Sequence, residues 1–326
     1  AEIVCNLSAS PFRAGVVGTR REMIATRAGD NQCTIAYANL VGANDGLVFD
    51  GGGSVNQNGR PVLEAPRFHE GFSAVVVDLE RTTRCRREAS TWRSDLETFR
   101  ARERVVPEVA SGARTASRER LAYPAPPPGT TFFLPGASTP DRTPRDELLD
   151  DFYEALTLGV ADYYRKTGAF KCVGLALSGG RDSLLTLLVA WGALRRIHAG
   201  LDGDALAEKM KRSLFAFYMP TRFSSGATRD AAARIAQDLG ATFQVLPIEE
   251  AFERELQATR TMLGEGGPAP TAITQQNVQA RIRGQRMWNW ANSSGALFLQ
   301  TGNMSEKALG YTTVGEPSGI PVLVLH

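Results

Sequence analysis

The chain has 326 residues, enough for two domains of ordinary size, and 43% of them are hydrophobic, which allows each domain a core. Its 37 basic and 35 acidic side chains leave a net charge of +2, which gives no reason to expect nucleic acid or a membrane surface as a partner. No apolar stretch has the length of a membrane span and the first residues lack a signal-peptide pattern, so we expect a cytoplasmic protein.

Residues 2–79 are rich in short strand patterns. Four segments have alternating β-branched residues, namely 2–10, 33–42, 46–55 and 73–79, and Gly or Asn marks turns between strands. A turn is expected at "NQNG", which ends at Gly59, and a helix at residues 19–28. These patterns predict a mixed α/β layer with a substantial sheet.

The cysteines are Cys5, Cys33, Cys85 and Cys172. They show no Cys-x-x-Cys spacing, which favours reduced intracellular cysteines over a disulfide framework. Cys5 alternates with the apolar Ile3 and Leu7, so we expect its side chain to pack against the sheet and not to act as a nucleophile.

Composition changes between residues 80 and 144. Arginines are concentrated at 81–120, and "YPAPPPGTTFFLPGASTPDRTP" then strings prolines and glycines together. We interpret this segment as a linker or a poorly packed excursion with a solvated surface, and an anion-binding arm is the alternative.

From residue 145 onwards short apolar runs alternate with helical patterns. Two helices are predicted with both bounds, at 146–166 and 276–291. A third follows the first strand and ends at 196, a fourth follows the second strand and ends at 239, and a fifth begins at about 249. Strands are predicted at 172–177, 214–218, 242–246 and 296–299. This alternation is typical of a doubly wound parallel sheet, which binds ligands beyond the carboxyl ends of its strands.

The stretch "LALSGGRDSLL" bends at two glycines between the first of these strands and its helix. Gly179 and Gly180 permit a close approach of the backbone, and the first amides of the helix favour an anion. Ser178 and Ser183 can donate from their hydroxyls, while Asp182 suits a Mg²⁺ ion held against phosphate. A phosphate site is therefore predicted, and a tight turn with incidental polar residues is the alternative.

The order Ser-Gly-Gly-x-Asp-Ser resembles the pyrophosphate loop of the ATP pyrophosphatase family, whose members cut ATP between its α and β phosphates and transfer AMP. It differs from a Walker loop because no Gly-Lys-[Ser/Thr] follows. "FYMPTRFSS", "NVQARIRG" and "TGNMSEKALGY" follow in turn, and together these stretches resemble the synthetase domain of glutamine-dependent NAD⁺ synthetases over residues 153–313.

Arg281 and Arg283 are spaced too closely to share one helix face, and the alternative for each is an ordinary surface residue of the helix.

This resemblance implies roles for individual residues. The ATP-binding residues would be Ser178, Gly179, Gly180, Asp182, Ser183 and Thr301. Ser178 and Asp182 would be the catalytic residues, and Asp182 and Glu306 the Mg²⁺ ligands. Asn277 and Glu306 would contact deamido-NAD⁺, and an ordinary acid at a helix N-terminus is the alternative for Glu306.

The first 80 residues resemble the second half of a nitrilase-type glutaminase domain, with Ser10 at a glutamine-binding position. Two departures stand out. The basic residue that the family has six positions later is replaced by Val16, for which Arg13, Arg20 or Arg21 could compensate only if the loop is rearranged. The family's Glu-Lys-Cys catalytic set would lie upstream of residue 1, and its acidic Gly-Asp turn is absent after "GYTTVG", so we expect the chain to be incomplete at both ends and unable to hydrolyse glutamine.

The resulting prediction is an α/β protein in three parts: a partial nitrilase-like domain (1–90), a linker (91–145) and a synthetase domain (146–326) that forms a homo-oligomer. It would amidate deamido-NAD⁺ with ATP through an acyl-adenylate, using glutamine or ammonia as the nitrogen source. The alternatives are another amidotransferase of the ATP pyrophosphatase family and a fragment that binds nucleotide without turnover.

Overall fold

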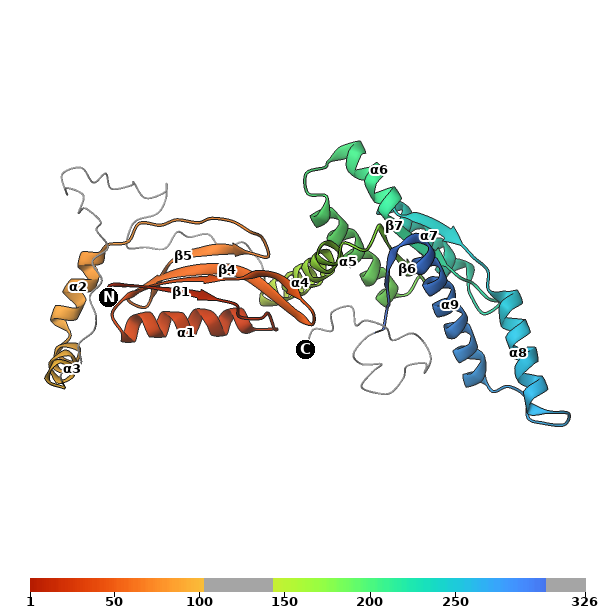
Figure 1. The fold of residues 1–326 in the computed structure, drawn as a ribbon, viewed down its shortest axis with the longest axis horizontal. Coiled ribbons are helices and arrows are strands. Elements are labelled where there is room, and N and C mark those ends of the chain that lie inside the picture. Colours follow the sequence, from red (N-terminus) through yellow and green to blue (C-terminus); the bar gives the residue numbers. More distant parts are fainter. Residues whose placement is uncertain (103–142, 303–326) are drawn as a thin grey trace. The chain divides into compact units, whose positions relative to one another are not determined.

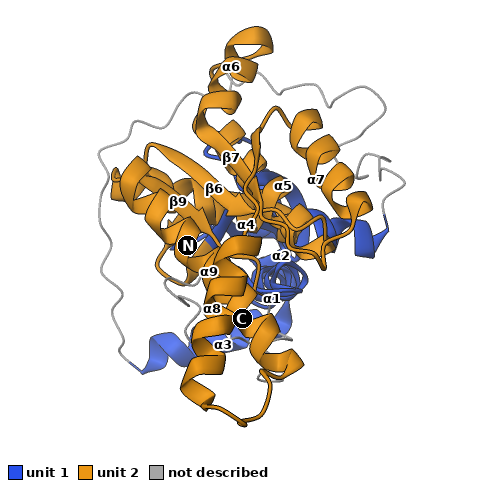
Figure 2. Ribbon diagram, turned by 90° about the vertical axis from the view of Figure 1, so that its right-hand side faces the viewer, with its two compact units in different colours: residues 1–41, 49–150 blue, residues 42–48, 151–326 orange. Residues whose placement is uncertain are grey.

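The structure is a computed structural model and describes residues 1–102 and 143–302 (Figure 1). The chain divides into two compact units, residues 1–41 with 49–150 and residues 42–48 with 151–326 (Figure 2). The described residues form one sheet of five strands and one of four, both with helices packed on them. The predicted α/β class is therefore confirmed.

The sheet near the N-terminus is mixed. Its strands are β1 (Ile3–Ser8), β2 (Thr34–Asn39), β3 (Val41–Asn44), β4 (Leu47–Gln57) and β5 (Arg60–Arg67). They lie in the order β1-β2-β4-β3 with β5 beside β4, and only β1 and β2 among the registered pairs are parallel. Helix α1 (Val16–Asp30) packs against β2 and β5 and buries Val16, Ile24 and Ala28.

The turn predicted at "NQNG" is confirmed. Asn58 (φ 49°) and Gly59 (φ 85°) both adopt positive φ values, as a tight hairpin between β4 and β5 requires. The sequence did not predict β5, because Pro61 and Pro66 interrupt its pattern. An edge position accommodates both prolines, since a proline cannot donate to the next strand.

The predicted strand at 73–79 is wrong. Residues 70–78 have no regular structure, and Val76 is 65% exposed. The alternation of "SAVVVDL" is insufficient because a strand also needs a partner for its amides, and no described strand pairs with this segment. Asp78 instead accepts a hydrogen bond from the Arg81 amide (3.2 Å) and so caps the following helix.

Helices occupy the first part of the predicted linker. They are α2 (Leu79–Glu88) and α3 (Ser90–Ala101). Arg86 Nε donates to the Gln32 carbonyl (2.8 Å), and its guanidinium lies 5.0 Å from the centre of the Trp92 ring. Arg86 is thus packed, but Thr82 is the buried residue of α2 and α3 buries none, which agrees with the expected solvated surface; residues 103–142 lie outside the described residues.

The second sheet is wholly parallel, as predicted. Its strands are β6 (Cys172–Ala176), β7 (Leu214–Tyr218), β8 (Thr242–Val245) and β9 (Ala296–Leu299). They lie in the order β8-β7-β6-β9. Both β7 and β9 begin and end where the sequence predicted, because strands buried on both faces form continuous apolar runs.

Six helices accompany this sheet among the described residues. They are α4 (Pro144–Thr167), α5 (Arg181–Ile197), α6 (Gly203–Ser213), α7 (Gly226–Asp238), α8 (Glu249–Leu263) and α9 (Ala272–Ser294). The sequence predicted five of them and missed α6, a mostly exposed helix with Met210 and Ser213 as its buried residues. With few buried positions, α6 lacks the wide apolar stripe that marks a packed helix.

Alternate side chains of the parallel strands enter separate cores. Val173 of β6 and Ala216 of β7 pack with residues of α4, α5 and α7. Phe217 packs on the opposite face against α9 residues, including Trp290. A Cβ on Gly174 would lie 2.2 Å from the Trp290 ring, so this glycine makes room for the indole. Helices therefore cover both faces, which leaves the strand ends as the open positions.

His198, just after α5, makes the stability depend on pH. Burial lowers the pKa of His198 below its ordinary 6.5, and the charges of Lys209 and Arg165 lower it further. As the pH falls below 6.5, the unfolded chain takes up a proton that the folded chain does not, so the free energy of unfolding decreases until the lower folded-state pKa is reached. Above pH 6.5 the histidine is neutral in both states, so it adds no pH dependence to the free energy of unfolding.

We expect urea unfolding to detect this dependence. The free energy of unfolding should fall more for the wild type than for His198→Gln between about pH 7.5 and about pH 5.5. An equal decrease in both proteins would contradict the assignment to His198.

All four cysteines are free, as predicted, but the predicted burial of one of them is wrong. Cys33 and Cys172 are buried, whereas Cys5 is exposed. The expectation that Cys5 packs into the sheet is wrong, because β1 is an edge strand that is exposed along most of its length. No helix in the described part of the chain is long and apolar enough to span a bilayer.

Candidate nucleotide-binding site

Three loops leave the same edge of the parallel sheet. Because β7, β6 and β9 are parallel neighbours, their carboxyl ends lie side by side (Figure 2). The loop after β6 contains the predicted phosphate corner, residues 178–183. The loop after β7 is residues 219–225, and Thr301 follows β9. The fold thus brings together residues that are more than a hundred positions apart in sequence.

The phosphate corner is braced by its two serines. Ser183 is buried, and its hydroxyl donates to the Gly180 carbonyl (2.9 Å) and accepts from the Ser178 amide (3.2 Å). The two hydroxyl oxygens are 3.0 Å apart, and since the Ser183 proton is already used, Ser178 is the donor of this pair. Ser183 therefore supports the corner from within, and the exposed Ser178 is the serine that a ligand can reach.

Gly179 has a backbone that only glycine adopts readily. Its φ is +82°, in the left-handed region. A Cβ at this position would lie 2.5 Å from the main-chain oxygen of Thr228, in the first turn of α7. The corner is therefore packed on one side against rigid backbone, and its remaining side is exposed at Gly180.

Helix α5 begins at the corner with its N-terminus open. Gly180 is its N-cap, and no side chain of the described residues caps it. The first amides of a helix lack partners within the helix, and together with the helix dipole they form a site for anions. Asp182 lies exposed in this first turn, so its carboxylate is placed beside any phosphate bound there.

The loop after β7 is held firmly at its base. The carbonyls of Tyr218 and Pro220 accept from the amides of Leu246 (2.8 Å) and Ile248 (3.0 Å). The buried Thr221 hydroxyl donates to Gln279 Oε1 at 2.9 Å. Sequence reasoning missed Gln279, because a single glutamine in a helical pattern gives no signal that it is buried.

Helix α9 carries the other predicted residues on different faces. Arg283 Nε donates to the Met219 carbonyl (3.1 Å), while Arg281 is exposed, so the two arginines do not share a face, as predicted. Asn277 is half-buried near the start of the helix. Glu306, the predicted second carboxylate, lies outside the described residues, as do all residues after Gly302.

Ser10, the predicted glutamine-binding residue, lies in a tightly held turn of the N-terminal unit. Arg20 Nε donates to its hydroxyl (3.1 Å) and Arg20 NH2 to its carbonyl (2.8 Å). Arg20 NH1 donates to both carboxylate oxygens of the fully buried Asp50, at 2.7 and 2.9 Å. Arg20 thus reaches Ser10 directly, and each of its three side-chain nitrogens already donates to the chain. Val16, which replaces the family's basic residue, is buried.

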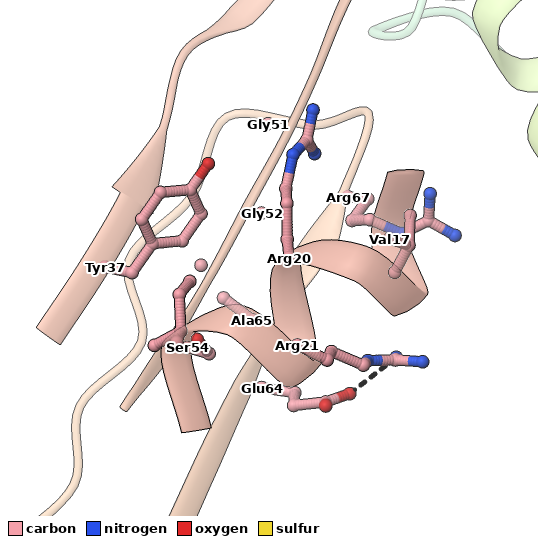
Figure 3. Close-up of a pocket in the computed structure, with 12 residues that line it drawn as sticks. Val17, Arg20, Arg21, Tyr37, Gly51, Gly52, Ser54, Glu64, Ala65 and Arg67 are labelled. Carbon is pink, nitrogen blue, oxygen red and sulfur yellow. Dashed lines mark hydrogen bonds and ion pairs between the residues drawn. The ribbon is translucent and has the colours of Figure 1, made fainter. Parts of the chain in front are cut away.

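A hollow of about 70 Å³ lies beside this network, between α1 and strands β4 and β5 (Figure 3). Gly51, Gly52 and Gly53 line it, so no side chain from this part of β4 fills the space. Arg20 and Tyr37 line the same hollow, and burial raises the pKa of the Tyr37 hydroxyl. Arg21 also faces it, and its ion pair with Glu64 (2.7 Å) closes the lower side in Figure 3.

The family of the chain follows from a comparison with known proteins. The sequence model of the NAD synthase family, described as "NAD synthase", matches residues 152–316. This match covers half of the chain and includes the phosphate corner, the loop after β7 and α9. The chain belongs to the NAD synthase family. The resemblance of residues 153–313 to NAD⁺ synthetases is thereby confirmed.

Curated relatives extend this similarity to the N-terminal unit. The glutamine-dependent NAD(+) synthetase of Aquifex aeolicus is 34% identical over 98% of the chain and 49% of its own length. That of Thermotoga maritima is 30% identical over 97% of the chain and 48% of its own length. The chain therefore spans about half the length of the curated relatives that it matches.

A solved structure is similar in fold along nearly the whole chain. It is the glutamine-dependent NAD⁺ synthetase from Acinetobacter baumannii in complex with ADP, with 27% identity and a TM-score of 0.67. The match covers 97% of this chain and 46% of that one. The N-terminal unit thus shares its fold with part of a glutamine-dependent synthetase.

Proposed function

We propose that the chain binds ATP at the phosphate corner and uses it to convert deamido-NAD⁺ into NAD⁺ by amidation. The observation that carries this proposal is the corner itself, where a left-handed Gly179 and the open N-terminus of α5 meet at the end of a central parallel strand. Membership of the NAD synthase family supports it, as does the ADP bound by the Acinetobacter relative. The protein would act in the cytoplasm as a homo-oligomer.

The triphosphate would lie over the N-terminus of α5. Amides of the first turn of α5 would bind phosphate oxygens. The Gly180 amide donates to Ser178 Oγ (3.2 Å) and the Ser178 hydroxyl donates to Ser183, so both groups would exchange these partners for phosphate oxygens when ATP binds. A Mg²⁺ ion would neutralise charge on the phosphates, and Asp182 fits this role because one carboxylate, phosphate oxygens and water satisfy that ion.

The remaining predicted residues would complete the site. Thr301 would lie by the ATP because β9 is the neighbour of β6, and Asn277 and Glu306 would contact deamido-NAD⁺. Glu306 would provide the second carboxylate for Mg²⁺. The synthetase domain would then run from 146 to 326, after a partial nitrilase-like domain (1–90) and a linker (91–145).

The reaction would have two steps. A carboxylate oxygen of the nicotinate ring attacks the α-phosphorus of ATP, the bond from this phosphorus to the bridging oxygen breaks, and pyrophosphate leaves. Charge that develops on the leaving group is stabilised by the loop amides, which are already oriented. Ammonia then attacks the acyl carbon of the adenylate, loses a proton and expels AMP, which gives the amide.

Glutamine would supply the ammonia in a full-length protein. Similarity of the N-terminal unit to glutamine-dependent enzymes supports this source, with Ser10 as a contact for glutamine. Arg20 donates to both the hydroxyl and the carbonyl of Ser10, so the position of Ser10 would be fixed before glutamine binds. The chain would use free ammonia when glutamine hydrolysis is absent.

A binding and turnover assay tests the proposal. Purified chain is titrated with Mg²⁺-ATP by calorimetry, and pyrophosphate is then measured after deamido-NAD⁺ and ammonium are added. We expect ATP to bind and pyrophosphate to appear once deamido-NAD⁺ is added, because the adenylate forms in the first step. Continued pyrophosphate release should require ammonium as well, because ammonia expels AMP and frees the site for the next turnover. Binding without pyrophosphate would contradict the catalytic proposal and support a nucleotide-binding fragment, whereas no ATP binding would reject the site altogether.

A further inference from the structure

A buried polar contact joins the loop after β7 to helix α9. Thr221 Oγ1 donates to Gln279 Oε1 at 2.9 Å, with Thr221 7% and Gln279 9% exposed. Two neutral polar side chains at this depth are stable only while they satisfy each other, because water cannot replace the missing partner. The contact therefore depends on an oxygen acceptor at position 279.

Arg283 fixes the orientation of the Gln279 amide. Its NH2 group also donates to Gln279 Oε1 (3.4 Å), and its Nε donates to the Met219 carbonyl (3.1 Å). Because a guanidinium has only donors, it must face the oxygen of the amide and not the nitrogen. Gln279 Nε2 turns the other way and donates to the Gln275 carbonyl of its own helix (3.4 Å).

The loop after β7 is thus held from two sides. The segment that leads into α8 donates to the Tyr218 and Pro220 carbonyls, and α9 holds Met219 and Thr221. Successive residues alternate between these two anchors. Without the α9 contacts, the loop would remain attached to the sheet on one side only.

Beyond Thr221 the loop leads directly to the phosphate corner. Ser225 caps α7 by accepting from the Thr228 amide (3.2 Å), and Thr228 is the residue whose backbone lies against Gly179. A displacement of the loop would therefore move the support of the corner. Helix α9 also carries Asn277, two residues before Gln279, and Asn277 is the residue proposed to contact deamido-NAD⁺.

We propose that Gln279 is a positioning residue of the synthetase site: through Thr221 and Arg283 it fixes the loop after β7, and so orders the ATP site from the helix that contacts the second substrate. This inference rests on the proposed function. Gln279 is buried and bonded within the chain, so it would act on binding by keeping the loop in one conformation before ATP arrives. Preorganisation of this kind raises affinity by lowering the ordering cost of binding.

Three substitutions in α9 test this role. Gln279→Leu keeps the size but removes the acceptor, so Thr221 and Arg283 lose a partner, and we expect the dissociation constant of Mg²⁺-ATP to rise roughly tenfold. Gln279→Glu keeps an oxygen toward both donors but replaces the Nε2 that donates to the Gln275 carbonyl; because Arg283 would pair with the added charge, ATP affinity should stay within about threefold of the wild type. Gln276→Leu, an exposed glutamine on the same helix, is the matched control and should change nothing.

The measurement combines ATP calorimetry with steady-state kinetics of pyrophosphate release. We expect the KM for ATP to rise in Gln279→Leu while kcat stays near its original value, since the reacting groups are unchanged. Equal affinity in wild type and Gln279→Leu, or a loss that Gln279→Glu does not rescue, would overturn the proposal. If Gln279→Leu does not fold, Thr221→Val removes the donor alone and must weaken ATP binding in the same way.

The two proposals fail differently. If the wild type binds no ATP, the proposed function fails and the Gln279 variants become irrelevant to it. If the wild type binds ATP but the Gln279 variants bind it equally well, only the positioning role is lost.

Discussion

Gly179→Ala is expected to weaken Mg²⁺-ATP binding by about 100-fold. An alanine in the left-handed region costs about 1–2 kcal/mol, and its Cβ would also lie 2.5 Å from the Thr228 carbonyl oxygen. A backbone oxygen in a helix cannot rotate away as a side chain can. The corner must then change its conformation, which turns the Gly180 amide and the start of α5 away from the phosphates.

Calorimetry with Mg²⁺-ATP measures this loss, and circular dichroism checks that the variant remains folded. Gly200→Ala is the matched control, because Gly200 lies beyond the other end of α5 and an added Cβ there would meet no atom within 4 Å. We expect the control to bind ATP as the wild type does. Unchanged affinity in Gly179→Ala would mean that ATP does not bind at this corner.

The phosphate corner could be predicted from sequence because its signal is local. Gly179 and Gly180 follow a continuous apolar strand and precede a helix, so the neighbours in sequence are also the neighbours in space. The role of Gly179 against Thr228 was not predictable, since it depends on how α7 packs on the loop. Gln279 was missed for the same reason: burial of a polar side chain is decided by distant elements.

The strands were predicted with unequal success. Short apolar runs in the parallel sheet gave the exact bounds of β7 and β9, because burial on both faces leaves a strong pattern. The run at 73–79 has similar residues but no partner strand, and the exposed Cys5 shows that alternation alone does not say which face is covered. Which strands pair, and which face of a strand is covered by other elements, are properties of the whole fold, so a window of ten residues does not determine them.

Asp50→Ala should destabilise the N-terminal unit by about 3–5 kcal/mol. The Asp50 carboxylate is fully buried, accepts two hydrogen bonds from Arg20, and also lies 3.6 Å from the Arg67 guanidinium. Its removal leaves positive charge beneath α1 without the carboxylate that compensates it. Asn39, which donates to Asp50 and holds both the amide and the carbonyl of Ser10, would lose one of its anchors as well.

Hydrogen exchange of peptides from β2 and β4 measures this effect in the N-terminal unit alone, because slow amides report the local free energy of opening. Glu64→Ala is the matched control: its ion pair with Arg21 has the same length, 2.7 Å, but Glu64 is 46% exposed. An exposed pair contributes at most about 1 kcal/mol, so exchange in the control should change little. Similar losses in both variants would show that burial of Asp50 does not set its contribution to the stability of the N-terminal unit.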